Sequence, residues 1–78
     1  MIKVSVYYSM NLTSWGDYDS ALESLAESSG GTRDGGGTDF DRNERDLSFI
    51  FPTEADARTF AQRVNGWPSR NFRVEVGV

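Results

Sequence analysis

The chain has 78 residues, enough for one small domain with a single core. It contains no cysteine and no histidine, which excludes disulfides, thiolate nucleophiles and the usual zinc sites. The formal net charge is −4, and a negative chain repels nucleic-acid phosphates. The N-terminus shows neither a signal-peptide pattern nor an apolar run long enough to span a membrane, so we expect a cytoplasmic protein.

The first quarter of the chain predicts a strand followed by a helix. Apolar residues occupy every second position over residues 2–8, the period of a half-buried strand. We place residues 10–16 in a connection, with Trp15 in a loop folded over the core. Asp17 then caps a helix whose apolar residues recur at helical spacing from Tyr18 to Ala26.

The middle of the chain predicts a loop and a hairpin. Residues 28–31 end the first helix, and residues 32–37, with three successive glycines, predict a flexible loop. We expect a short strand over residues 38–41, with Phe40 pointing inward, and a hairpin turn over residues 42–45.

The second half carries the clearest patterns. Leu47, Phe49 and Phe51 alternate with polar residues and Ile50 in a strand that needs a cover on one face. Thr53 is a helix N-cap candidate, and apolar residues recur at helical spacing over residues 57–64 until Gly66 ends the helix. Alternating residues over 72–78 predict a last strand.

The predicted order β-α-β-β-α-β is that of the ferredoxin-like fold, an α+β domain spanning residues 1–78. In that fold a four-stranded antiparallel sheet carries two helices on one face, with the first and third strands in the centre. The acids Asp39 and Asp41 would then protect an edge strand against pairing with other sheets.

Residues 45–66, R-D-L-S-F-I-F-P-T-E-A-D-A-R-T-F-A-Q-R-V-N-G, resemble the third strand and second helix of the RNA-recognition motif. The resemblance implies a module whose open sheet face stacks aromatic residues on bases. Anchored on the helix cap, however, the alternation directs Leu47, Phe49 and Phe51 to the helix side. This is the alternative function, and its contacts would be Lys3, Tyr7, Arg70 and Arg73.

Metal and enzyme chemistry find little support in the sequence. Asp39-x-Asp41-x-Asn43 imitates the start of an EF-hand calcium loop, but Glu44 occupies the glycine position and Ile50 the bidentate glutamate position. The glycine-rich segment 30–37 lacks the lysine of a phosphate-binding loop. We therefore expect no metal, no cofactor and no enzymatic activity.

Acidic residues concentrate in the first half of the chain. Nine acids face three arginines over residues 17–46, a net charge of −6, whereas three acids face four arginines over residues 47–78, a net charge of +1. One negative surface would bind the basic surface of another protein, unless it only maintains solubility. The candidate partner-binding residues are Asp19, Glu23, Glu27, Asp34, Asp39, Asp41 and Glu44.

In size, acidity and lack of cysteine and histidine, the chain resembles small accessory proteins of phages and mobile elements, including anti-CRISPR inhibitors. The resemblance implies a non-enzymatic inhibitor or adaptor that mimics nucleic acid and binds a CRISPR effector subunit in the host cytoplasm. We expect a monomer or weak homodimer with no direct nucleic-acid or membrane partner. A third class is an assembly subunit that self-associates through a sheet edge or face.

Overall fold

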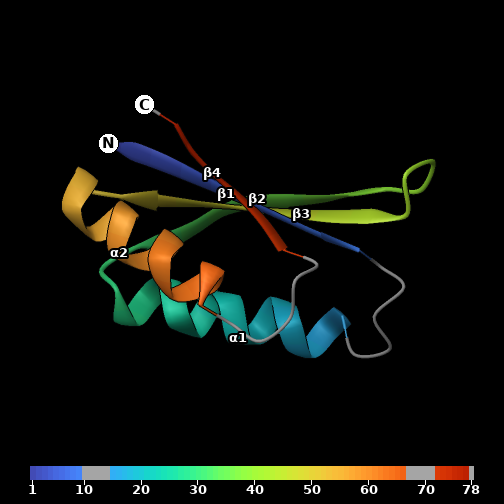
Figure 1. Cartoon of the computed structure of the whole chain (residues 1–78), viewed down its shortest axis with the longest axis horizontal. Coiled ribbons are helices and arrows are strands. Elements are labelled where there is room, and N and C mark those ends of the chain that lie inside the picture. The colour runs from blue at the N-terminus through green and yellow to red at the C-terminus, as the bar shows by residue number, and fades with distance from the viewer. Residues whose placement is uncertain (10–14, 67–71, 78) are drawn as a thin grey trace.

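The computed structural model describes residues 1–9, 15–66 and 72–77. Its elements follow one another in the order β1 (Ile2–Ser9), α1 (Trp15–Ser28), β2 (Thr32–Asp39), β3 (Glu44–Phe51), α2 (Glu54–Asn65) and β4 (Phe72–Gly77). All strand pairs are antiparallel and form one sheet in the order β2-β3-β1-β4. Both helices lie on the same face of this sheet (Figure 1). The predicted ferredoxin-like fold, with the first and third strands in the centre, is confirmed.

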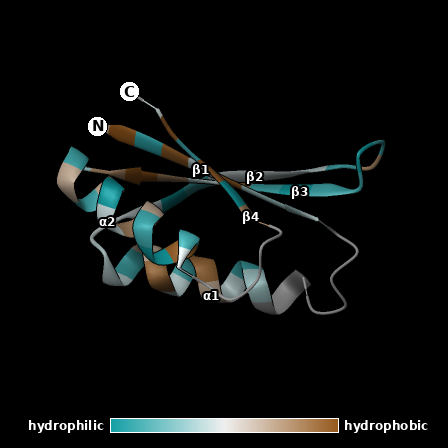
Figure 2. Ribbon diagram, in the orientation of Figure 1, coloured by the Kyte–Doolittle hydropathy of each residue, from teal (hydrophilic) through white to brown (hydrophobic). Residues whose placement is uncertain are grey.

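The core lies between the sheet and the two helices. It is formed by side chains that are at most 1% exposed from the helix-facing side of β1 and β3, from α1 and from α2. The ring of Phe60 on α2 lies 5.2 Å from the rings of both Phe49 and Phe51 on β3. The predicted alternation of β3 is therefore confirmed. Figure 2 shows hydrophobic residues on α1 and, alternating with hydrophilic ones, along β1.

Helix α2 begins and ends where the sequence predicts. The Thr53 hydroxyl accepts a hydrogen bond from the backbone N–H of Asp56 at 3.2 Å, which satisfies one of the donors left unbonded in the first turn. At the other end the N–H of Gly66 donates to the carbonyl of Gln62 at 3.0 Å. These two caps fix the helix directly after β3, and its Phe60 packs on two rings of that strand.

Helix α1 begins at Trp15 rather than after Asp17, so the loop predicted for Trp15 is wrong. Asp17 falls in the first turn of the helix instead of preceding it. Asp is a favourable residue type both at the N-cap and in the first turn of a helix, so the sequence alone does not separate the two positions.

Strand β2 replaces the loop predicted for residues 32–37. Its glycines are in register with β3, where Gly36 lies opposite Leu47 and Gly37 opposite Asp46, after a bulge between Arg33 and Gly35. A Cβ atom on Gly36 would lie 2.9 Å from Cδ2 of Leu47 on the paired strand β3, so the close approach of that side chain explains this glycine. Pairing with β3 outweighs the weak strand propensity of glycine.

The hairpin turn lies over residues 40–43, two residues earlier than predicted. Phe40 is 82% exposed in this turn, so the prediction that it points inward is wrong. The carboxylate of Asp39 accepts hydrogen bonds from the N–H groups of Asp41 and Arg42 at 3.1 and 3.2 Å, and Asn43 adopts a left-handed φ of 53°. Both features are typical of Asp and Asn in tight turns.

Candidate functional site: the acidic side

The acidic half of the sequence forms neighbouring elements at one edge of the sheet. Residues 17–46 make up most of α1, then β2, the turn and the first residues of β3, and we call this part the acidic side. It surrounds edge strand β2, whereas β4 is the opposite edge of the sheet. In Figure 2 the hairpin of β2 and β3 extends beyond the helices and its distal part is hydrophilic.

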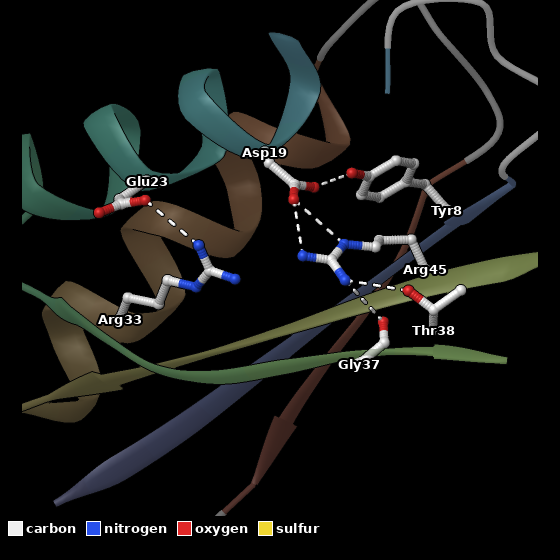
Figure 3. A network of polar contacts seen from close by, with 7 residues as sticks. All are labelled: Tyr8, Asp19, Glu23, Arg33, Gly37, Thr38 and Arg45. Atoms are coloured by element: carbon white, nitrogen blue, oxygen red, sulfur yellow. Dashed lines mark hydrogen bonds and ion pairs between the residues drawn. The ribbon is translucent and has the colours of Figure 1, made fainter. Parts of the chain in front are cut away.

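Asp19 lies inside the acidic side rather than on its surface. Its side chain is 14% exposed and that of Arg45 is 16% exposed. Arg45 Nη2 and Nε donate to Oδ2 of Asp19 at 2.8 and 3.1 Å, while the Tyr8 hydroxyl donates to Oδ1 (Figure 3). Arg45 Nη1 also donates to Oγ1 of Thr38 at 3.0 Å. The network joins α1 to β1, β3 and β2, and we therefore leave Asp19 out of the proposed binding surface.

Three other candidate acids form exposed ion pairs. Glu23 lies 3.5 Å from Arg33, Asp39 lies 3.8 Å from Arg42, and Glu44 lies 3.6 Å from Arg73. Their side chains are between 28% and 50% exposed. Exposed pairs of this length contribute little to stability, so the carboxylates of Glu23 and Glu44 remain available to a cationic partner. Asp39 offers only Oδ2, because its Oδ1 accepts two hydrogen bonds in the turn.

The remaining acids of the acidic side whose side chains the structure describes keep their carboxylates open. No hydrogen bond or ion pair to another described residue involves the side chains of Glu27, Asp34, Asp41 or Asp46, and we call these four the open carboxylates. The first three are exposed and Asp46 is half-buried. Asp46 was not among the predicted site residues, although the alternation that turns Leu47 towards the helices turns Asp46 to the opposite, open face.

The open face contains a hollow of about 400 Å³ beside the hairpin. Its lining residues are Tyr7, Gly37, Thr38, Asp39, Arg42, Glu44, Asp46 and Arg73. Gly37 supplies no side chain there, and the Asp46 carboxylate lies above it, since a Cβ on Gly37 would be 2.9 Å from Oδ1 of Asp46. The guanidinium carbon of Arg73 lies 4.3 Å from the ring centre of Tyr7. One face of this ring is therefore occupied by the protein itself.

These positions bear on the alternative contacts for nucleic acid. Lys3 and Tyr7 lie on the open-face positions of β1, and Arg73 lies beside Tyr7 on β4. Arg70 lies outside the described residues. Base stacking on the ring face of Tyr7 that Arg73 covers would first have to displace the guanidinium from the cation–π contact, and the open face of the sheet also carries Asp46, Glu44 and Asp39.

The acids of the hairpin lie where the EF-hand-like pattern was noted in the sequence. Asp39, the first residue of the EF-hand-like pattern, uses its carboxylate in the turn and lies beside Arg42. Within residues 1–9, 15–66 and 72–77, no group of three or more acidic side chains is arranged to hold a metal ion. Neither helix there is long and apolar enough to cross a membrane.

Comparisons with protein-family models, with curated proteins and with solved structures found no match to this chain. The functional argument therefore rests on the charges and contacts of the acidic side.

Proposed function

We propose that the protein is a non-enzymatic inhibitor or adaptor that docks its acidic side on the basic surface of another protein. The supporting observation is that four of the five described acids whose side chains have no hydrogen-bond or ion-pair partner, the open carboxylates, belong to the acidic side, and the fifth is Asp56 on α2. By contrast, Glu54 on α2 lies 2.6 Å from Arg58, and Glu75 on β4 lies 3.7 Å from Arg73. Most of the described acids that the fold leaves without a cation therefore belong to the acidic side.

A surface of this kind attracts proteins whose working face is basic, and proteins that bind nucleic acids are common examples. Carboxylates spaced over a helix, a strand and a turn can occupy the positions of successive phosphates. An anti-CRISPR inhibitor that fills the nucleic-acid channel of a CRISPR effector subunit would be one instance of this function.

The proposal is tested by affinity capture from host lysate with two variants of equal charge change. The triple variant E27Q/D34N/D41N removes three open carboxylates, and E54Q/D56N/E75Q removes three acids from α2 and β4. We expect basic proteins to be captured by the wild type and the second variant but not by the first. The captured proteins should elute as rising salt shortens the Debye length from about 10 Å towards about 3 Å.

A mobility-shift assay with RNA and DNA supplies the second arm. The proposed function predicts no shift with either nucleic acid. A shift that is lost on replacing Tyr7 or Arg73 would instead favour the module that uses the open sheet face. Equal capture by both triple variants would contradict a role for the acidic side.

A further inference from the structure

Strand β2 is an edge strand of eight residues. One of its edges pairs with β3, and no described strand pairs with the other. Such an edge offers backbone N–H and C=O groups to an incoming strand. Natural proteins usually cover or shorten edges of this kind. The glycines and charges of β2 therefore indicate what could pair with it.

The three central glycines of β2 differ in what the fold requires of them. A Cβ on Gly36 would lie 2.9 Å from Leu47, and one on Gly37 would lie 2.9 Å from the Asp46 carboxylate. A Cβ on Gly35 would meet nothing within 4 Å, and its φ lies outside the left-handed region. The fold therefore gives no reason for glycine at Gly35. Glycine in a strand also marks close approach by another backbone.

The charges around this edge select the kind of strand that it can accept. Asp34 lies in the bulge and Asp39 ends the strand. Glu27 lies one helical turn after Glu23, whose carboxylate already reaches Arg33 of β2 at 3.5 Å. A second copy of the protein would bring an edge of the same net negative charge, whereas a basic segment would compensate the acids.

We propose that β2 accepts an extended, basic segment of a partner protein as a fifth strand of the sheet. This inference rests on the proposed function and gives the form in which the partner binds. Backbone hydrogen bonds along β2 supply affinity, and side chains of the incoming strand cover the bare positions at Gly35 and Gly37. Its basic residues pair with Asp34 and Asp39.

Two synthetic peptides test the proposal on the unmodified protein. The peptide RVTVRVTVR alternates as a strand does, and RVPVRPTVR keeps its three arginines but lacks one backbone N–H on each edge. Fluorescence anisotropy should show that the proline peptide binds at least about tenfold more weakly, as expected from the loss of a hydrogen bond and of strand geometry. Hydrogen exchange should show new protection of β2 amides and none on β4.

Two matched variants locate the binding edge. Gly35→Lys adds a lysine to β2, where there is open space, and Gly77→Lys adds one to β4, where a Cβ makes only ordinary contact 3.5 Å from the Lys3 carbonyl. We expect Gly35→Lys to weaken binding of RVTVRVTVR about tenfold and Gly77→Lys to change it by less than about twofold.

Several results would overturn the fifth-strand proposal. In the binding assay, they are equal binding of the two peptides and equal effects of the two lysine variants. In hydrogen exchange, the result would be protection confined to β4. In sedimentation, it would be self-association that Gly35→Lys abolishes. Equal and salt-sensitive binding of both peptides would leave the proposed function intact, since charge alone would then suffice. Failure of the proposed function itself would instead be seen in equal capture by the two triple variants.

Discussion

Strand β3 can be compared with itself along its length. From Leu47 to Phe51 every second side chain is fully buried against the helices. From Glu44 to Asp46 all three side chains are charged, and Arg45 reaches Asp19 of α1 instead of an apolar core. The comparison shows that one strand can be held by apolar packing at one end and by a half-buried ion pair at the other. The end held by the ion pair, residues 44–46, belongs to the acidic side.

The largest effect is expected at the packed end of β3. Replacing Phe49 by Ala removes a fully buried ring that contacts Phe60, and such truncations cost about 3–5 kcal/mol of unfolding free energy. Because domains of this size are stable by only about 5–15 kcal/mol, urea denaturation should show a large fall in the midpoint. A change below about 1 kcal/mol would mean that this end is not tightly packed.

The charged end of β3 should respond next most strongly. Asp19→Ala leaves the Arg45 guanidinium, which is 16% exposed, without its carboxylate, and we expect a loss of about 2–3 kcal/mol. A double-mutant cycle with Arg45→Met should return a coupling energy of about 1–3 kcal/mol. Additive effects in that cycle would show that the ion pair does not hold α1 to the hairpin.

A pair of glycine substitutions on β2 sharpens the comparison at the neighbouring strand. Gly36→Ala places a Cβ 2.9 Å from Leu47 and should destabilise the protein by about 1–3 kcal/mol. Gly35→Ala meets open space and should stabilise it by up to about 1 kcal/mol by reducing the freedom of the unfolded chain. Thermal unfolding of both variants measures the contrast, and the same sign for both would contradict it.

The smallest effect is expected at the turn. Phe40 is 82% exposed, so Phe40→Ser should change the unfolding free energy by less than about 0.5 kcal/mol. Urea denaturation beside Phe49→Ala provides the matched comparison of two phenylalanines on one hairpin. A loss above about 1 kcal/mol would show that Phe40 packs against the protein in solution.

The sequence was informative where structure depends on neighbours in the chain. The alternation of β3 and the caps of α2 involve residues at most four positions apart, so the pattern alone predicted them. Strand β2 was predicted as a loop because glycine has little strand propensity, and only its pairing with β3 makes it a strand.

The acidic side was predictable in composition but not in detail. The helical spacing of Asp19, Glu23 and Glu27 was visible in the sequence. The burial of the Asp19 side chain, however, depends on its ion pair with Arg45, 26 positions later. Ion pairs across such separations follow from tertiary structure and leave no local pattern. The sequence therefore identified the charged half of the molecule without distinguishing the acids that are open from those already held by arginine.

The pairing of β1 with β4 has a practical consequence for all of these experiments. Gly77 lies opposite Lys3 in that pair, so the start of the central strand β1 and the end of the edge strand β4 are neighbours (Figure 1). A tag, fluorophore or fusion partner attached at either end is therefore separated from β2 by at least one intervening strand. Immobilising the molecule in this way would present the acidic side outward to whatever is passed over it.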